Sequence, residues 1–321
     1  MLTISAAEVD QALTFEELVD TLRGAFTEGA VQPVRHHHTI ERLDGVPSTL
    51  LLMPAWSDFA GGAASPGYIG VKLVTISPDN NRIGKPAVMG VYLLLDGATG
   101  EPLAMIDGQR LTQWRTAAAS ALASTYLSRE DSSRLLVIGA GAMALFLARA
   151  HAAVRPISRI RIWNRTFANA QKIAVELTGE GFDAEAVADL DPEIGRADIV
   201  SSATISPTAL VRGEALRPGT HLDLVGAFTP EMRESDDEAV LRSRIFVDTR
   251  AGAVKEAGDI VQPLQSGTLV HDDILGELAE LCRGTVQGRQ SHDEITLFKS
   301  VGAALEDLAG GIAVYRAVAR R

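Results

Sequence analysis

Three cationic side chains in the first 120 residues stand where a buried anion would explain them. Lys72 interrupts the apolar run Val71–Ile76, and an ammonium group is costly to bury unless it is paired or takes part in chemistry. Arg115 falls in the first turn of a helix expected from about Thr112 to Leu127, where a cation opposes the helix dipole. An anionic ligand there would be held by the guanidinium and by free backbone N–H groups together. With Arg35 as a third cation, these residues predict a site for a small carboxylic acid.

Simpler interpretations of the same cations stay open. Lys72 would face solvent if its strand had one polar side, and Arg115 would then be an exposed side chain on an ordinary helix. The triple His36-His37-His38 does not predict a metal site, because adjacent residues of a strand point to alternating faces. Met53 is a candidate for the border of the substrate site and is equally suited to the core.

A glycine-rich turn follows an apolar run in the middle of the chain. The run Leu135–Ile138 predicts a buried strand, and the Ala-rich stretch that continues to about Val154 predicts a helix. Between them, Gly139 permits a sharp turn, Gly141 permits close approach to a pyrophosphate, and Ala144 permits tight packing of the helix on the strand. The motif alone is weak, but its place between a strand and a helix favours dinucleotide binding over an ordinary connection.

The tip of the next predicted strand indicates which dinucleotide binds. An NAD site carries an acidic residue about 20 residues beyond the glycines, where it binds the ribose hydroxyls. This chain has Asn164-Arg165-Thr166 at that place, without an acid. Arg165 would pair with a 2′-phosphate, and Asn164 and Thr166 would hydrogen-bond to it. The sequence therefore predicts NADPH as the preferred cofactor and NADH as the alternative, unless Arg165 is only a solvated surface residue.

Composition limits the other kinds of function. The chain has 321 residues, 46% of them hydrophobic, which is enough for two domains with their own cores. Its net charge of −11, without a basic run, argues against nucleic acid and anionic membranes as partners. No apolar run is long enough to span a bilayer, and the first residues lack the features of a signal peptide. With Cys282 as the only cysteine, we expect a protein of the reducing cytoplasm.

The periodicity changes along the chain and predicts two kinds of domain. A helix capped by Thr14 precedes short strands joined by a turn at Asp96–Gly100, which is typical of an antiparallel sheet. These strands are expected at Val34–Ile40, Thr49–Trp56, Tyr68–Ser77, Val88–Leu95 and Glu101–Asp107. From Arg134 onward, alternating strands and helices predict a doubly wound parallel sheet. Its further strands are expected at Ile157–Trp163, Asp198–Ala203, Leu222–Phe228 and Ile245–Asp248, with a helix at Phe167–Leu177.

The chain beyond Asp259 is expected to be mostly helical and to return to the first domain. The apolar face of its last helix would consist of Val301, Leu305, Leu308, Ile312 and Tyr315. The predicted fold is therefore α/β. Residues 1–120 and 299–321 form an α+β domain, and residues 121–298 form the doubly wound, dinucleotide-binding domain.

Several motifs, taken in order, resemble the ornithine cyclodeaminase/mu-crystallin family over nearly the whole chain. They are VKLVTISPDNNRIGKP, DGATGEPLAMIDG, LTQWRTAAASA, VIGAGAMA, WNRT, DLVGAFTPEMRESD and ITLFKSVGAALEDL. The resemblance implies a Rossmann domain set between the two parts of a substrate-binding and dimerisation domain, and a homodimer. Members of the family include ornithine cyclodeaminases, alanine dehydrogenases and reductases of cyclic imino acids.

The resemblance also implies roles for individual residues. It places the substrate carboxylate against Arg35, Lys72 and Arg115. The residues that it places against the dinucleotide are Thr116, Gly139, Gly141, Ala142, Met143, Ala203, Thr204, Val225, Gly226, Ser300, Val301 and Gly302.

One departure from the family pattern bears on the reaction. The cyclodeaminases have an Asp in the segment where this chain has Val225-Gly226-Ala227-Phe228, and Phe228 stands at its position. Cyclodeamination needs a base that exchanges protons with the substrate nitrogen, which a phenyl ring cannot do. Phe228 would instead line an apolar substrate pocket. With Phe at this position and with Lys299 in LFKSVG, the sequence resembles the Δ1-pyrroline-2-carboxylate reductases of the family.

These features predict an NAD(P)H-dependent reductase that converts Δ1-pyrroline-2-carboxylate or Δ1-piperideine-2-carboxylate to L-proline or L-pipecolate. Lys72 is a candidate for delivering the nitrogen proton. Two other hypotheses stay open. One is a cyclodeaminase or amino-acid dehydrogenase of the same family, and the other is a crystallin-like protein that binds NADPH without turnover. The intact glycine motif and the retained cations argue against the second.

Overall fold

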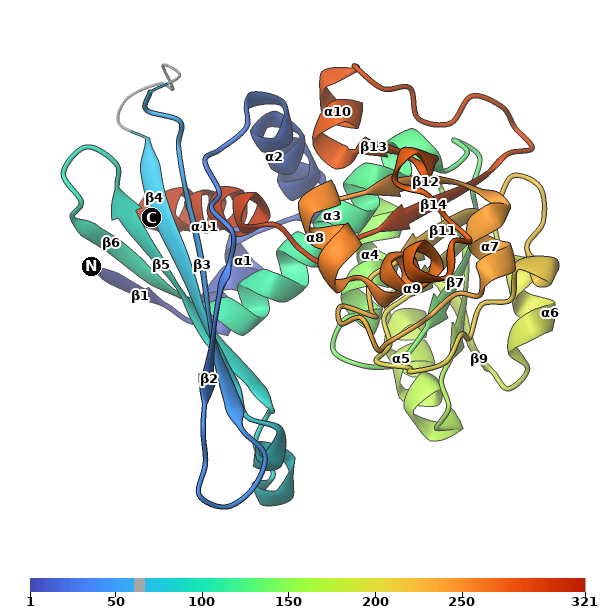
Figure 1. Ribbon diagram of the computed structural model, residues 1–321, viewed down its shortest axis with the longest axis horizontal. Coiled ribbons are helices and arrows are strands. Elements are labelled where there is room, and N and C mark those ends of the chain that lie inside the picture. Colours follow the sequence, from blue (N-terminus) through green and yellow to red (C-terminus); the bar gives the residue numbers. More distant parts are fainter. Residues whose placement is uncertain (61–66, 321) are drawn as a thin grey trace. The chain divides into compact units, whose positions relative to one another are not determined.

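The structure is a computed structural model that describes residues 1–60 and 67–320. The chain divides into two compact units, each with its own sheet (Figure 1). Unit 1 comprises Met1–Arg115 and Ala304–Arg321, and unit 2 comprises Thr116–Ala303. The divisions therefore fall a few residues from those that the sequence suggests, and Lys299 belongs to unit 2.

The sheet of unit 1 has six strands in the order β1-β6-β5-β4-β3-β2. Their bounds are β1 Leu2–Ile4, β2 His36–Ile40, β3 Ser48–Trp56, β4 Tyr68–Ile76, β5 Val88–Asp96 and β6 Pro102–Asp107. Strands β2 to β6 pair antiparallel, as the sequence predicts, whereas β1 joins the edge parallel to β6 and was not predicted. Asp96 closes the predicted turn, because its carboxylate accepts hydrogen bonds from the backbone N–H groups of Ala98 and Thr99.

The helices of unit 1 come from both ends of its sequence. They are α1 Ala6–Ala12, α2 Phe15–Glu28, the first part of α3 Gly108–Leu127, and α11 Ala304–Ala319. Thr14 caps α2 by accepting a hydrogen bond from Glu17 N, as predicted. Helix α11 packs on α2 and on β3, β4 and β5, which confirms the predicted return of the C-terminal helix. Val301 lies before α11, so its assignment to the apolar face of that helix is wrong.

The start of α3 differs from the sequence prediction in a way that affects Arg115. The helix begins at Gly108, directly after β6, and Asp107 Oδ1 accepts a hydrogen bond from Arg110 N at 2.7 Å. Arg115 therefore lies about two turns inside the helix rather than in its first turn. The N–H groups around it are engaged in the helix, so the prediction that they share an anion with the guanidinium is wrong.

Unit 2 contains a parallel sheet of eight strands in the order β13-β12-β14-β11-β10-β7-β8-β9. Their bounds are β7 Arg134–Ile138, β8 Arg159–Trp163, β9 Asp183–Val187, β10 Ile199–Ser202, β11 His221–Leu224, β12 Ser243–Val247, β13 Ile274–Glu277 and β14 Ile295–Lys299. Its helices are α4 Ala144–Val154, α5 Phe167–Gly179, α6 Leu190–Ile194, α7 Asp237–Leu241, α8 Arg250–Glu256, α9 Gly258–Ser266 and α10 Leu278–Arg283. None of the helices within the described residues is long and apolar enough to cross a membrane.

Helices cover both faces of this sheet, which confirms the predicted doubly wound fold. Side chains of α4 and α5 form one core cluster with the sheet, and side chains of α6 to α9 form a second cluster with it. The strand order reverses between β7 and β10, so the turns that follow these two strands flank a crevice of the kind in which doubly wound proteins bind nucleotides.

The chain beyond Asp259 contains the helices α9, α10 and α11, as predicted, but also two strands that the sequence did not suggest. Strand β14 lies inside the sheet between β11 and β12, and β13 forms the edge next to β12. All five residues of β14 are buried. A short strand buried on both faces has no apolar–polar alternation, so sequence periodicity does not reveal it.

A buried polar group ties α4 to the sheet of unit 2. Asp223 on β11 accepts a hydrogen bond from Ser201 Oγ at 2.7 Å, and its Oδ2 lies 3.2 Å from His151 Nε2 on α4. The three residues are fully buried. Burial opposes ionisation of Asp223, but the hydrogen bonds and the charges of its partners outweigh it and hold the pKa of this carboxyl below its ordinary value. The core therefore contains an ionised carboxylate that stabilises the fold.

We expect Asp223→Asn to lower the free energy of unfolding by about 2 kcal/mol at neutral pH, because a charged acceptor of buried hydrogen bonds is lost. The pKa of Asp223 is depressed in the folded state, so its contribution is present above the ordinary carboxyl pKa of 3.8 and disappears as the pH falls below it. Urea unfolding at several pH values should show the two proteins converging in acid.

The matched control is Asp183→Asn, which changes a largely exposed carboxylate of the same sheet. It should leave the free energy of unfolding nearly unchanged, because ion pairs at the surface contribute little to stability. A stability difference between wild type and Asp223→Asn that stays constant down to acid pH would contradict the assignment of an ionised Asp223.

Candidate active site

Four charged side chains of unit 1 form a buried cluster. Lys72 Nζ lies 2.7 Å from Asp307 Oδ2. Arg115 reaches Asp307 Oδ1 through Nε at 3.0 Å and Glu306 Oε2 through Nη1 at 2.6 Å. None of the four residues is more than 5% exposed. The structure thus brings two of the three predicted cations together, and two carboxylates that the sequence did not suggest join them.

Three elements supply this cluster. Lys72 lies on β4 beside Met53 of β3 and Tyr92 of β5, on the face of the sheet that is buried. This burial excludes the interpretation that Lys72 faces solvent. Glu306 and Asp307 occupy the first turn of α11, where the helix dipole stabilises negative charge.

The charges of the cluster balance one another. Burial and the charge of Arg115 lower the pKa of Lys72 to about 8, although Asp307 and Glu306 act in the opposite direction. Burial opposes ionisation of Asp307, but Arg115 and Lys72 outweigh it and hold the pKa of this carboxyl below its ordinary value. Burial also opposes the charge of Arg115, yet the two carboxylates outweigh it and raise the pKa of the guanidinium. Lys72 is therefore the group of this cluster that can release a proton near neutral pH.

Tyr92 adds a polar group that the sequence did not suggest. Its side chain is buried, and its hydroxyl has no hydrogen-bond partner among the residues that the structure describes. Two glycines provide its space, because a Cβ on Gly70 would overlap the hydroxyl and a Cβ on Gly311 would lie 2.5 Å from ring atom Cε1. Burial and the charge of Asp307 raise the pKa of Tyr92 well above its ordinary value, so the phenol stays neutral.

The glycine-rich turn of unit 2 has the geometry that a pyrophosphate requires. Gly139 adopts a φ of +102°, and a Cβ there would lie 2.9 Å from the carbonyl oxygen of Ala203. A Cβ on Gly141 would meet no atom within 4 Å, so the backbone is open at that point. Helix α4 follows without a side-chain cap at Met143, which leaves N–H groups of its first turn for an anion. These residues, with Ala142 between them, fit the phosphates of a dinucleotide.

The two residues that follow β8, Asn164 and Arg165, have different roles. Asn164 Oδ1 accepts a hydrogen bond from Ala140 N at 3.1 Å, and its Nδ2 donates to the Thr166 carbonyl at 3.0 Å. Asn164 therefore stabilises the glycine-rich turn rather than standing free. Arg165 is exposed and has no ion-pair or hydrogen-bond partner within residues 1–60 and 67–320, so its guanidinium is free for a ligand.

The other predicted dinucleotide contacts of unit 2 follow three strands at the carboxyl edge of the sheet. Ala203 and Thr204 follow β10, Val225 and Gly226 follow β11, and Ser300 to Gly302 follow β14. Carboxyl ends of parallel strands share one edge, which is also the edge that carries the glycine-rich turn. The structure thus brings these residues to one side of unit 2.

A buried acid that the sequence did not suggest holds one of these turns. Asp248, which follows β12, accepts hydrogen bonds through Oδ2 from Val301 N at 2.7 Å and from Gly302 N at 2.6 Å. The sequence does not reveal this role of Asp248, because the residue lies more than 50 residues from the turn that it supports.

The remaining candidates occupy more open positions. Phe228 lies in the loop after β11 and is 45% exposed, so its ring is available to a ligand. Thr116 is partly exposed on α3, and Arg35 is partly exposed just before β2. The three histidines of β2 are exposed, and no group of His, Cys, Asp and Glu in the part of the chain that the structure describes could hold a metal ion.

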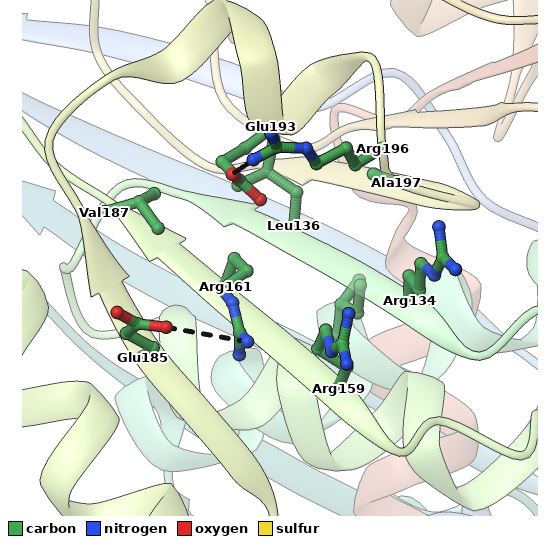
Figure 2. Close-up of a pocket in the computed structure, with 10 residues that line it drawn as sticks. Arg134, Leu136, Arg159, Arg161, Glu185, Val187, Glu193, Arg196 and Ala197 are labelled. Carbon is green, nitrogen blue, oxygen red and sulfur yellow. Dashed lines mark hydrogen bonds and ion pairs between the residues drawn. The ribbon is translucent and has the colours of Figure 1, made fainter.

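A cavity of about 380 Å³ lies elsewhere in unit 2 (Figure 2). It borders the amino ends of β7 and β8, where Arg134 and Arg159 are the first strand residues. Its other charged lining residues are Arg161, Glu185, Glu193 and Arg196. Arg159 and Arg161 pair with Asp183, and Arg196 pairs with Glu193. The cavity therefore lies away from the dinucleotide turn, and most of its arginine charge is already compensated.

Comparison with known proteins agrees with the sequence motifs. The model of the ornithine cyclodeaminase/mu-crystallin family matches residues 1–320. A Δ1-pyrroline-2-carboxylate reductase of Colwellia psychrerythraea is 37% identical over 99% of this chain and 100% of its own length.

Solved structures extend this similarity to the fold. The Thermococcus litoralis Δ1-pyrroline-2-carboxylate reductase in complex with NADH and L-proline is 33% identical, with a TM-score of 0.92 over 100% of this chain and 98% of that one. An archaeal alanine dehydrogenase dimer with bound NAD is 28% identical, with a TM-score of 0.89 over 100% of this chain and 96% of that one. Because motifs, fold and full-length match coincide, the chain belongs to the ornithine cyclodeaminase/mu-crystallin family.

Proposed function

We propose that the protein reduces a cyclic imino acid, Δ1-pyrroline-2-carboxylate or Δ1-piperideine-2-carboxylate, to L-proline or L-pipecolate with NADPH or NADH. The observation that carries the proposal is the full-length similarity to a reductase solved with NADH and L-proline. The buried cations of unit 1 and the open glycine turn of unit 2 suit such a pair of ligands. We place the activity in the cytoplasm, because a chain with a single cysteine cannot form an intramolecular disulfide.

The charge balance around Lys72 favours a zwitterionic substrate. An ammonium has three N–H donors and a guanidinium five, so Lys72 and Arg115 can bind a carboxylate beside Asp307 and Glu306. The four side chains already sum to zero charge, and a ligand with a net negative charge would leave an uncompensated charge in a buried site. A cyclic imino acid protonated on nitrogen is neutral overall. We therefore expect this form to bind.

The residues of the chain then hold the substrate and manage its proton. When bound, the reduced nicotinamide supplies the hydride that the imine carbon accepts. Lys72 and Arg115 orient the carboxylate, which fixes the plane of the C=N bond. Hydride transfer to the protonated imine leaves a neutral amine in the ring. Lys72, with a pKa of about 8, can donate the proton that converts this amine to the ammonium form, at small free-energy cost. Phe228 cannot exchange protons, which favours reduction over cyclodeamination or amino-acid oxidation.

The cofactor is proposed to be NADPH in preference to NADH. The phosphates would lie against the turn from Gly139 to Met143 and the N-terminus of α4. Arg165 has a free guanidinium at the tip of β8, where a 2′-phosphate of the adenosine ribose would pair with it. Thr166 adds an exposed hydroxyl at the same tip.

The protein is proposed to be a homodimer that pairs through the sheet of unit 1. One face of this sheet is buried under α11, whereas the alternate residues on the other face are apolar and partly exposed. These residues include Leu52, Pro54, Val71, Leu73, Val91, Leu93 and Met105. A continuous apolar sheet face of this kind marks an interaction surface, and a second copy of the chain would cover it with matching apolar residues.

We expect Lys72→Ala and Arg115→Ala each to lower kcat/KM by roughly 10- to 100-fold or more. Each variant removes a charge-assisted contact to the bound carboxylate and leaves a buried carboxylate of the cluster without its partner. In the wild type, kcat/KM should fall as the pH rises through about 8, where Lys72 loses its proton. Both effects can be measured by NADPH oxidation with five- and six-membered cyclic imino acids over a range of pH. In Lys72→Ala, the fall of kcat/KM near pH 8 should be absent.

Arg110→Ala is the control for these variants. Arg110 lies on α3, as Arg115 does, but its side chain is one-third exposed and pairs with Asp10 at the surface. It should retain nearly wild-type kinetics. Wild-type efficiency in both Lys72→Ala and Arg115→Ala would show that the carboxylate binds elsewhere.

Arg165→Ala should raise the KM for NADPH by roughly tenfold or more, because one charge-assisted phosphate contact is lost, while the KM for NADH stays unchanged. Steady-state kinetics with both cofactors measure the change. Arg159→Ala is the matched control, because it removes another exposed arginine from the opposite end of β8. An equal change for NADPH and NADH would argue against a 2′-phosphate contact.

Leu93→Asp should convert the dimer to a monomer, because it places a charge in the middle of the apolar sheet face. Sizing by light scattering after gel filtration measures the mass in solution. Val175→Asp replaces a 73% exposed apolar residue on α5 and should leave the mass unchanged. A wild-type protein that is monomeric at micromolar concentration would overturn the proposed assembly.

A further inference from the structure

Unit 2 contains a second buried group of charges, formed by Glu234, Asp259 and Lys299. All three residues are fully buried. Lys299 ends β14, Asp259 lies in the first turn of α9, and Glu234 lies in the loop between β11 and α7. Neither the glycine motif nor the predicted substrate anchors include them. We call them the buried triad.

Glu234 holds the turn that follows β10. Its Oε1 accepts hydrogen bonds from Ser202 Oγ at 2.6 Å, from Thr204 N at 2.6 Å and from Thr204 Oγ1 at 2.8 Å. One carboxylate oxygen therefore fixes both the backbone and the side chain of Thr204. The other oxygen, Oε2, has no hydrogen-bond partner among the described residues.

Lys299 holds the turn that follows β11. Its ammonium donates a hydrogen bond to the carbonyl of Gly226 and lies 3.3 Å from Asp259 Oδ2. Asp259 in turn accepts hydrogen bonds through Oδ1 from Glu234 N at 2.8 Å and from Ser235 N at 2.9 Å. The triad thus links the loop that carries Glu234 to the ends of β11 and β14.

The two turns that the triad holds are in close contact and have little freedom. A Cβ on Gly226 would clash with the backbone of Thr204 and lie 2.6 Å from Glu234 Oε1. Ala227 adopts a φ of +50°, which is unfavourable for a residue with a side chain. Its N–H donates to the Thr204 carbonyl at 3.2 Å. The surrounding hydrogen bonds therefore maintain a strained turn at the carboxyl edge of the sheet.

A purely structural role explains the triad poorly. Two carboxyl groups and one ammonium are buried together, and apolar residues of similar size would fill the same space at lower cost. Burial and the charge of Asp259 raise the pKa of Glu234, although Lys299 acts in the opposite direction. Buried charges of this kind are retained where they fix a conformation that function requires.

We propose that the buried triad positions the nicotinamide end of the cofactor by fixing Thr204 and Gly226 at the carboxyl edge of the sheet. This inference rests on the proposed function. It takes the nicotinamide to lie against the turns after β10, β11 and β14, where the family resemblance implies contacts to the dinucleotide. Glu234 and Lys299 are then positioning residues. They act through the two turns and do not touch the reacting atoms.

The test compares the whole cofactor with a fragment that lacks the nicotinamide. Calorimetric titration gives the Kd of NADPH, of NADH and of adenosine 2′,5′-bisphosphate for wild type, Glu234→Gln and Lys299→Met. Both variants should weaken the two whole cofactors by roughly tenfold, which corresponds to about 1.4 kcal/mol. The Kd of the fragment should change less than about twofold, because the glycine turn and Arg165 are untouched.

Asp223→Asn is the matched control, since it also removes a buried carboxylate from this sheet but touches neither turn. It should destabilise the fold and leave all three Kd values unchanged. Lys299→Met can fail to fold, and in that case Glu234→Gln, which is nearly isosteric, decides alone.

The outcomes separate this inference from the proposed function. If wild type binds neither NADPH nor NADH, both are overturned. If wild type binds them and the variants bind cofactor and fragment with unchanged or equally weakened affinity, only the inference about the triad is overturned. Weakening confined to the whole cofactors would support it, and a changed fluorescence of NADPH bound to Glu234→Gln would locate the effect at the dihydropyridine ring.

Discussion

The ion pair between Lys72 and Asp307 is the constraint on which the rest of unit 1 depends. An ammonium on β4 and a guanidinium on α3 can both be buried only if opposite charges reach them. Both carboxylates come from the first turn of α11, at the far end of the sequence. The C-terminal helix therefore returns to unit 1 for electrostatic as well as hydrophobic reasons, since it also packs on α2 and three strands. Glycines at 70 and 311 then leave room for the ring of Tyr92 between strand and helix.

Sequence periodicity predicted most of the fold, because the strands of unit 1 alternate in burial and the helices of unit 2 carry regular apolar faces. It failed for β14, whose five buried residues have no alternation, and for β1, which has three residues. It also failed for β9 and β13, the short strands at the two edges of the sheet of unit 2. The start of α3 was also misplaced, because Asp107 caps the helix at a point where the apolar pattern gives no boundary. These errors have a common cause. The existence or the start of each element is determined by pairing with distant strands or by a single capping residue, and neither leaves a periodic pattern in the sequence.

Parts of the candidate site could be predicted from neighbouring residues in the sequence, whereas other parts depend on residues that are distant in the sequence. The glycine turn is encoded within a few consecutive residues, and the φ of Gly139 and the open backbone at Gly141 have the geometry that the motif predicts. Lys72 was recognisable as a cation in an apolar strand, whereas the reason that drew attention to Arg115, a place in the first turn of its helix, was wrong. The partners of both cations were not recognisable, because Arg115 and Asp307 are 192 residues apart. Sequence reasoning can therefore show that a buried charge needs a partner, but only the fold identifies which residue provides it.

The two buried charge groups differ in a way that suits the direction of the proposed reaction. The cluster of unit 1 pairs two cations with two carboxylates, whereas the triad of unit 2 sets one ammonium against Glu234 and Asp259. Reduction of a protonated imine removes a positive charge from the substrate and creates one on the oxidised nicotinamide. A balanced cluster binds the neutral zwitterion, and hydride transfer leaves the substrate with one net negative charge until its ring nitrogen accepts a proton. In the triad, ionisation of Glu234 gives an excess of negative charge behind the turns that we propose to hold the nicotinamide, and this charge favours the pyridinium.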